Sequence, residues 1–572
     1  MRVRRAAIAT TVASMVVAAL TASDCPSLPD NGSLEAGRKG SAVRAYEPAH
    51  RGGTLRMLAR SAAGAWDPQV SYSPQFWQLL PAVYDGLMAF AQVNGPQSFQ
   101  VVPDLVASMP QVERGGTRYV FTLRRGIRFS TGAAVTPGDV AASLRRIFTV
   151  GSPTAASYRS IVGADACLSA PTTCALPGVT VDEAAGTVTI DLVAPDADLL
   201  LALAVPTAAV LPAGTPVTSA ATGTSQATTD TAPPAGTGAY RVASYDPAGS
   251  LVLERNPYFT EWSRAAQPDG YPDRIVEEFG HDPAAALTDV RLGRADALYD
   301  RPPPERLAEL EAAGPAQVHV NPLTGLWYLA LNTHLPPFDQ LEPRQAVNWA
   351  LDREAVARRF GGPALATPAC TLLPAGILGH RQDCQYAREP GPGTGADLDR
   401  ARALVSRSGT AGQRVRLLVP DDAVGPGVGQ EVAAALEAVG YRASVRALAP
   451  DLYYRYVQDP GNDVQLSLAN AFQDYPSPAS FLQALLGCAR GGDPSPSGSC
   501  DAALQSRVRA AAAVADRAAA DRAWAVVDHD VMTAAPIAPL ITPSQVDVVS
   551  TRVGNYQWSK QYRMIVSQLW VR

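Results

Sequence analysis

The chain lacks the short motifs that usually mark an enzyme active site. Its six histidines never take the His-x-x-x-His spacing of a zinc protease helix, and neither a Gly-x-Ser-x-Gly turn nor a Gly-x-x-x-x-Gly-Lys phosphate loop occurs. Gly236-Thr237-Gly238 is half of a dinucleotide fingerprint, and strand-like residues follow it rather than a helix. The sequence therefore predicts a protein without catalysis, cofactor or metal.

Asp474 is the residue whose type and position best suit ligand binding. It comes shortly after a predicted strand at 463–468, and open α/β sheets bind ligands beyond the carboxyl ends of their strands. A carboxylate in a desolvated cleft is a strong partner for a primary ammonium group, because charge-assisted hydrogen bonds are the strong ones. The alternative is an ordinary turn aspartate ahead of Tyr475 and Pro476.

Two pairs of aromatic residues are candidates for the walls of the same cleft. Trp327 and Tyr328 precede a predicted strand, and Phe76 and Trp77 lie in an early segment of the chain. Aromatic side chains supply a large contact area at a small cost in conformational entropy. Core packing is the alternative for each of the four.

Six of the seven cysteines form three pairs that are close in sequence. Local pairs in an exported chain predict disulfides that close loops, although other connectivities stay open. The expected pairs are Cys167–Cys174, Cys370–Cys384 and Cys488–Cys500.

The N-terminus predicts export and attachment to the membrane. Three arginines within the first five residues precede an apolar run from Ala6 to Ala22, which is the pattern of a secretory signal and is too short for a confident membrane span. The seventh cysteine, Cys25, follows directly, so we expect a lipid anchor there, on the outer face of the cell membrane. Plain cleavage near Ala22 is the alternative, because Asp24 replaces the small residue that normally precedes a lipidated cysteine.

Length and charge bound the remaining possibilities. A chain of 572 residues exceeds one ordinary core and predicts two or three lobes. The net charge is −5, and the 48 basic and 53 acidic residues are well mixed, which argues against a nucleic acid partner. The low-complexity stretch 213–235 predicts a mobile surface loop.

Hydrophobic periodicity predicts the elements that position these residues. The first half gives a strand ending at Leu58, a strand pair over 118–129 that turns at Gly126, and a helix from Pro137 that Thr136 caps. One amphipathic helix is expected over 344–360. Helix and strand then alternate in the manner of a βαβ sheet, with helix 398–407, strand 414–419, helix 428–439, strand 442–448, helix 451–457 and strand 463–468, before a helical region at 502–533.

Short blocks between residue 52 and the C-terminus resemble, in order, a known family. They include Val83-Tyr84-Asp85-Gly86-Leu87, Val102-Pro103-Asp104-Leu105, and the segments 52–55, 119–129, 135–140, 236–240, 253–257, 329–332, 344–352 and 474–478. The sequence is similar to the large oligopeptide, dipeptide and nickel class (family 5) of extracellular solute-binding proteins that serve ABC importers.

This resemblance implies a mixed α/β, bilobal periplasmic-binding-protein-like fold with an extra small lobe and a ligand cleft at the hinge. The implied parts are a signal peptide (1–25), a flexible tether (26–45), lobe I (46–90, 232–318 and 530–572), a small lobe (91–231) and a ligand-clamping lobe II (319–529).

The resemblance also implies that Asp474 pairs with the α-ammonium group of a peptide, beside Phe472 and Tyr475. Family members commonly carry Trp three positions before this aspartate, where this chain has Ala471, so either Phe472 replaces that wall or the ligand differs. The implied function is a monomeric receptor that delivers a peptide or another small solute to an ABC permease and its ATPase subunits. The alternatives are an exported peptide or ester hydrolase, or a signalling or adhesion module on the same fold.

Overall fold

The structure, a computed structural model, describes residues 46–217, 232–388, 395–459, 461–486, 495–514 and 516–572. The predicted signal peptide, the tether, Cys25, Cys488 and most of the low-complexity loop lie outside these ranges. In the ranges described, no helix is long and apolar enough to cross a membrane.

A twelve-stranded sheet joins strands from distant parts of the sequence. Its main path is β16-β15-β17-β13-β18-β11-β1-β10-β9-β8, and β12 and β14 also pair with β18. One group of strands lies toward the last part of β18: β1 (Thr54–Leu58), β8 (Tyr240–Tyr245), β9 (Ser250–Arg255), β10 (Arg274–Glu278), β11 (Ala297–Leu298) and β12 (Val318–Pro322). The other group lies toward its first part: β13 (Gly325–Leu331), β14 (Ala366–Pro368), β15 (Arg414–Pro420), β16 (Arg442–Leu448) and β17 (Leu466–Phe472).

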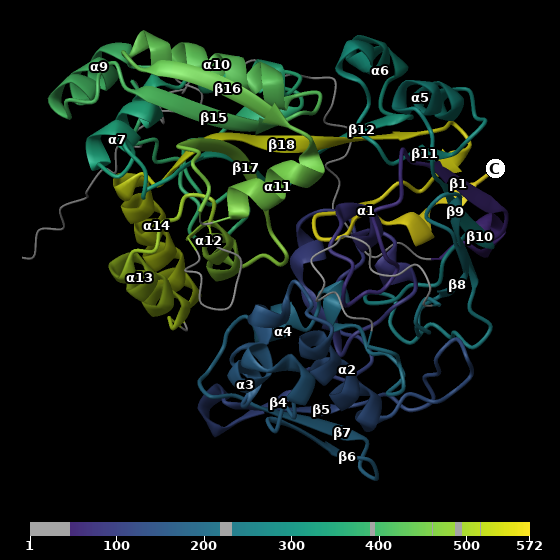
Figure 1. Ribbon diagram of the computed structural model, residues 1–572. Helices are drawn as coiled ribbons and strands as arrows, with labels where there is room; N and C mark the ends of the chain where they lie inside the picture. Colours follow the sequence, from purple (N-terminus) through teal and green to yellow (C-terminus); the bar gives the residue numbers. More distant parts are fainter. Residues whose placement is uncertain (1–45, 218–231, 389–394, 460, 487–494, 515) are drawn as a thin grey trace, which may run out of the picture. The chain divides into compact units, whose positions relative to one another are not determined.

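The long strand β18 (Ile537–Val549) belongs to both groups of strands. Along its first part it pairs with β13, where Ala330 lies opposite Ile537, and along its last part it pairs with β12, where Val318 lies opposite Val548. Figure 1 shows it as a long yellow arrow between the two groups. Its two ends are buried, and its middle carries the polar and less buried Thr542, Ser544 and Gln545.

The predicted alternation of helix and strand in the second half is confirmed. Helices α9 (Leu398–Arg407), α10 (Gly425–Ala438) and α11 (Pro450–Gln458) accompany β15, which pairs in parallel with both β16 and β17. Strand β17 begins three residues later than predicted, because the Asn462 side chain accepts a hydrogen bond from the Val464 backbone and holds the chain in a turn.

Two predicted helices are each interrupted. The expected helix over 344–360 is wrong as one element: α7 (Leu341–Ala350) ends before the extended Leu351, and α8 (Arg353–Arg359) begins where the Asp352 side chain accepts from the Ala355 backbone. An aspartate at this position caps a new helix rather than continuing the old one. The region 502–533 likewise forms α13 (Ala502–Ala512) and α14 (Arg517–Ala534), which Asp516 caps.

A separate four-stranded antiparallel sheet lies within residues 91–231. Its order is β4 (Gln111–Glu113), β5 (Arg118–Thr122), β7 (Thr187–Asp191) and β6 (Val179–Asp182). Helix α2 (Pro137–Thr149) begins with the predicted Thr136 cap, completed by Asp139 into a capping box. The expected strand pair over 118–129 is wrong: β5 pairs with β4 and β7, and after the turn at Gly126 only an isolated bridge at Arg128 remains.

The remaining elements are short and connect these sheets. They include α1 (Pro74–Trp77), β2 (Met88–Phe90), β3 (Val101–Pro103), α3 (Ala164–Ser169), α4 (Leu199–Ala202), α5 (Pro283–Arg291), α6 (Leu307–Ala313), α12 (Pro478–Leu486), β19 (Val553–Gly554), β20 (Trp558–Ser559), β21 (Arg563–Met564) and β22 (Trp570–Val571).

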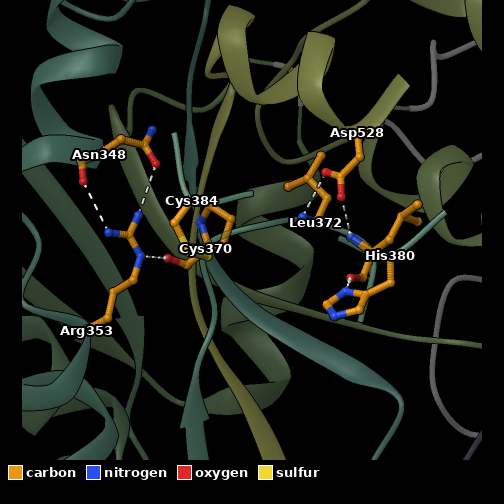
Figure 2. Close-up of a disulfide and its surroundings, with 9 residues drawn as sticks. Asn348, Arg353, Cys370, Leu372, His380, Cys384 and Asp528 are labelled. Carbon is orange, nitrogen blue, oxygen red and sulfur yellow. Dashed lines mark hydrogen bonds between the residues drawn. A yellow bond between two sulfur atoms is a disulfide. The ribbon is translucent and has the colours of Figure 1, made fainter. Parts of the chain in front are cut away.

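Two of the predicted disulfides are confirmed, Cys167–Cys174 and Cys370–Cys384. Cys500 is also disulfide-bonded, and Cys488 lies outside the described residues. Helix α14 holds the loop that Cys370–Cys384 closes, since the buried carboxylate of Asp528 accepts from the backbone N–H groups of Leu372 (3.0 Å) and Leu373 (3.4 Å) (Figure 2).

Candidate functional site

Asp474 lies in the loop between β17 and α12 and has two contacts from distant segments. The Tyr72 hydroxyl donates to Oδ1 of Asp474 at 2.5 Å, and the side-chain amide of Gln561 donates to its backbone oxygen at 2.5 Å. Its side chain is partly buried, and no cationic side chain of the described ranges forms an ion pair with it.

Burial raises the pKa of the Asp474 carboxyl from 3.8 to about 6, and the hydrogen bond from Tyr72 acts in the opposite direction. Burial disfavours the charged form because it removes water from the carboxylate, and the donated hydrogen bond favours that form. At neutral pH the group is therefore mostly ionised and lacks a counter-ion from the protein. Such a group binds a cation, preferably one that also donates hydrogen bonds.

The loop that carries Asp474 joins three regions of the sequence. The first region is the N-terminal segment with Tyr72, and the second is the turn between β20 and β21, near the C-terminus, with Gln561. The third region is the segment just before α4, where the Asp198 carboxylate accepts a hydrogen bond from the Ser477 hydroxyl. The buried Tyr475 packs in a hydrophobic cluster with Tyr158. Sites formed where distant segments meet are typical of ligand-binding clefts.

The predicted aromatic residues divide into those near Asp474 and those in the core. Trp77 lies edge-on to Tyr72, with ring centroids 5.6 Å apart, and its indole N–H donates to the Ser71 carbonyl at 3.0 Å. Phe76, its neighbour, is 0% exposed and packs in a hydrophobic core. Phe76 thus serves packing, whereas Trp77 packs against the same core and also lies beside Tyr72, the hydrogen-bond partner of Asp474.

Phe472, Trp327 and Tyr328 lie on the paired strands β17 and β13. Phe472 is opposite Gly325, where a Cβ atom would come within 2.2 Å of its ring, so the absence of a side chain at Gly325 leaves room for this phenyl group. Trp327 is partly buried and packs against Phe360, with ring centroids 5.2 Å apart. Tyr328 is 2% exposed and belongs to the core.

Several polar groups beside Asp474 have no hydrogen-bond partner among the described residues. They are the Ser71 hydroxyl, both amide atoms of Gln473 and the amide oxygen of Gln561. Buried polar atoms are normally satisfied, so atoms without partners mark places where water or a ligand is expected. In the described part of the chain, no group of three or more histidine, cysteine or acidic residues is arranged to hold a metal ion.

Sequence reasoning missed Tyr72 and Gln561. Tyr72 stands only four residues before Phe76, so the aromatic segment itself was a usable signal. No sequence signal indicated Gln561, because its contact with Asp474 joins positions that are 87 residues apart.

Comparison with solved structures supports the predicted fold. The clavulanic acid biosynthesis oligopeptide binding protein 2 matches with a TM-score of 0.80 and 24% identity, over 94% of this chain and 98% of that one. The Haemophilus influenzae OppA complex with RPPGFSPFR matches with a TM-score of 0.72 and 18% identity, over 91% and 98%. The prediction of a bilobal fold of the periplasmic-binding-protein type is confirmed.

Sequence relatives match over shorter stretches. The periplasmic oligopeptide-binding protein OppA of Haemophilus influenzae is 29% identical over 27% of this chain and 28% of its own length. A dipeptide-binding protein of Pseudomonas aeruginosa is 23% identical over 57% of this chain and 59% of its own. Both alignments thus cover less than two thirds of the relative.

A model of the bacterial extracellular solute-binding proteins, family 5, matches residues 100–493, which is more than half of the chain and includes Asp474. This match agrees with the block order seen in the sequence, with the fold and with a receptor rather than an enzyme. The chain therefore belongs to family 5 of the bacterial extracellular solute-binding proteins.

Proposed function

We propose that this protein is a receptor that captures short peptides outside the cytoplasm and delivers them to an ABC importer. Family membership supports solute binding, and relatives named as oligopeptide- and dipeptide-binding proteins support the choice of peptides. Ligand binding favours the closed arrangement of the lobes only if the ligand makes better contacts there, and the proposed source of these contacts is the loop at Asp474, where three regions meet.

The observation that carries the peptide proposal is the unpaired carboxylate of Asp474. A peptide's amino terminus supplies the positive charge that Asp474 lacks in the described chain, and it adds hydrogen-bond donors to the one from Tyr72. Trp77 and Phe472 are the proposed aromatic contacts, and the backbone of the peptide is recognised independently of its side chains.

The test compares Asp474→Asn with the wild type, using free and N-acetylated forms of the same peptides. Removing one member of a buried charge pair costs about 2–5 kcal/mol, so calorimetry should show the affinity for free peptides falling at least about 30-fold. Acetylated peptides, which have no ammonium group, should bind the wild type weakly and lose little on substitution. Asp399→Asn, at an exposed carboxylate on α9, is the matched control and should change neither affinity.

Two outcomes contradict the proposal. Equal losses for free and acetylated peptides would make Asp474 a turn residue without a direct role. Failure of every peptide to bind the wild type would overturn the peptide assignment and leave membership of the family intact.

We also propose that the mature protein is monomeric and tethered to the outer face of the cell membrane by a lipid on Cys25. The three arginines within the first five residues, the apolar run from Ala6 to Ala22 and the position of Cys25 shortly after it support the lipid tether.

A further inference from the structure

We propose that Asp198 is a positioning residue: from the proposed small lobe (91–231), it holds the loop that carries Asp474 in place through a hydrogen bond from Ser477. This inference rests on the proposed function and deepens it, because it gives the small lobe a part in the binding of the peptide's amino end.

Asp198 bonds to a distant loop instead of capping its own helix. It stands directly before α4, where an aspartate side chain usually accepts from the first backbone N–H groups of the helix. The Asp198 side chain caps none of the described N–H groups of α4. It accepts instead from the Ser477 hydroxyl, 279 residues further along the chain. The contact therefore fixes the loop after β17 relative to the small lobe.

The charge of Asp198 strengthens this contact. Burial raises the pKa of its carboxyl from 3.8 to about 6; the hydrogen bond from Ser477 acts in the opposite direction, and the nearby Asp196 raises the pKa. At neutral pH the carboxyl is therefore mostly ionised and can only accept hydrogen bonds, so the Ser477 hydroxyl is the donor. Hydrogen bonds to an ionised acceptor are roughly twice as strong as those between neutral groups.

Ser477 passes this constraint on to α12. Its side chain is 1% exposed, and its hydroxyl oxygen also accepts from the backbone N–H of Ala479 at 3.1 Å, in the first turn of α12. The Ser477 backbone N–H donates to the Tyr475 carbonyl at 2.7 Å. One hydroxyl group thus connects Asp198 with both the loop and the beginning of the next helix.

Tyr475 is a second contact between this loop and the small lobe. It is 5% exposed and belongs to a hydrophobic cluster whose other buried members are Tyr562 and residues within 87–210, including Leu199 of α4. Of the described residues in 319–529, only Tyr475 belongs to this cluster. Its ring therefore packs beside the same short helix that Asp198 precedes.

Asp474 lies between two sets of contacts. Tyr72 and Gln561 bond to Asp474 itself, and Tyr475 and Ser477 hold the residues that follow it. A binding group has to be held within about 0.5 Å of its productive position. Loss of the Asp198 contact should therefore weaken the grip of Asp474 on an ammonium group, although Asp474 is unchanged.

The experiment uses the full-length protein and the same free and N-acetylated peptides. Asp198→Ala removes the acceptor, Asp198→Asn keeps an acceptor of similar shape, and Glu113→Ala removes an exposed carboxylate on β4 of the small lobe as the matched control. In calorimetry, Asp198→Ala should weaken free peptides about tenfold and acetylated peptides little. Asp198→Asn should retain most of the affinity, and Glu113→Ala all of it.

Two further measurements distinguish positioning from a general effect on stability. Combined with Asp474→Asn, Asp198→Ala should cause little additional loss for free peptides, because no charge remains to be positioned. Amide hydrogen exchange over 473–486 reports on the loop without any ligand. It should be faster in Asp198→Ala than in the wild type, and unchanged in Glu113→Ala.

The results separate this inference from the function on which it rests. If Asp198→Ala leaves exchange over 473–486 unchanged, or weakens free and acetylated peptides equally, the positioning role is overturned while peptide binding stands. If no peptide binds the wild type, the proposed function falls, and the exchange measurement still decides whether Asp198 holds the loop.

Discussion

At the scale of single residues, the charge on Asp474 controls binding in the proposed mechanism. Its carboxyl has a pKa near 6, because burial raises the pKa and the Tyr72 hydroxyl only partly opposes the effect. A peptide's α-amino group keeps its proton up to a pH of about 8. The ion pair between Asp474 and the peptide's ammonium group therefore exists mainly between about pH 6 and about pH 8.

We predict that peptide affinity rises between pH 5 and pH 7. The carboxyl must lose its proton to attract the ammonium group, so affinity is lost as the pH falls through about 6 and should be roughly tenfold weaker at pH 5 than at its maximum. Tyr72→Phe should move this midpoint to higher pH, because the lost hydrogen bond favoured the ionised form. Calorimetry across this pH range measures both effects, and affinity independent of pH would contradict the role of Asp474.

The sequence identified some site residues and not others for a physical reason. Asp474 lies beyond the end of a strand, which local patterns reveal. Its contacts with Tyr72 and Gln561 join positions 402 and 87 residues apart, which only the fold brings together. Phe76 and Trp77 are adjacent aromatic residues that the sequence does not distinguish, and only the fold shows that Phe76 is buried in the core while Trp77 packs on the same core and contacts Tyr72.

At the scale of elements, the hairpin of β2 and β3 brings two buried carboxylates together. Asp85 precedes β2 and Asp104 follows β3, at the same end of the antiparallel pair. Asp85 accepts hydrogen bonds from Thr237 and Gln267, both at 2.6 Å, and Asp104 accepts one from Trp262 at 3.0 Å. Burial raises the pKa of Asp85 to about 6, and burial together with Asp85 raises the pKa of Asp104 well above 3.8.

We predict that Asp104→Asn makes the stability of the fold less dependent on pH. A raised folded-state pKa means that the folded protein binds the proton more tightly than the unfolded chain, so the stability it gives is present at low pH and is lost as the pH rises through the folded pKa. An asparagine is neutral at every pH and is close to aspartic acid in shape. Thermal unfolding from pH 5 to pH 9 should show a smaller decline for the variant than for the wild type, and parallel declines would contradict this reasoning.

We predict that the Cys370–Cys384 disulfide stabilises the fold mainly through the unfolded chain. In the chain-entropy model, closing a loop of this length contributes about 3 kcal/mol to the free energy of unfolding. In the double variant Cys370→Ser and Cys384→Ser, the contacts from Asp528 on α14 still hold the loop in the folded state. Denaturant unfolding should show a loss of about this size with peptide affinity retained. A loss below about 1 kcal/mol would contradict the model for this loop.

Local patterns predicted most elements of the second half, because alternating helices and strands in a parallel sheet leave clear periodicity. Local patterns gave wrong predictions where a side chain ends a helix or where a strand pairs with a distant segment. The carboxylate of Asp352 ends the expected helix over 344–360. Strand β5 finds its partners in β4 and β7 rather than in the segment that follows Gly126.

At the scale of the whole molecule, β18 makes one sheet of strands that the sequence separates by hundreds of residues. Its first part pairs with β13, inside the range proposed for lobe II, although β18 itself lies in the C-terminal segment proposed for lobe I. No local pattern in Ile537–Val549 distinguishes a strand shared by two groups from one that serves a single lobe. The proposed lobe boundaries therefore remain a proposal, and β18 is a natural place for the chain to connect the lobes.

In the proposed function the receptor serves an importer in the membrane, and we predict that a lipid on Cys25 attaches it there. Cys25→Ser removes the thiol that a lipid would modify and leaves the preceding apolar run intact, so the variant should still be exported but should appear in the soluble fraction. Fractionation followed by mass spectrometry of the mature N-terminus measures both properties. Cys500→Ser, which alters a disulfide-bonded cysteine far along the chain, controls for general effects of losing a thiol. Wild-type protein that is already soluble and begins near Ser23 would show that Asp24 prevents lipidation, and the receptor would then require another means of staying close to its importer.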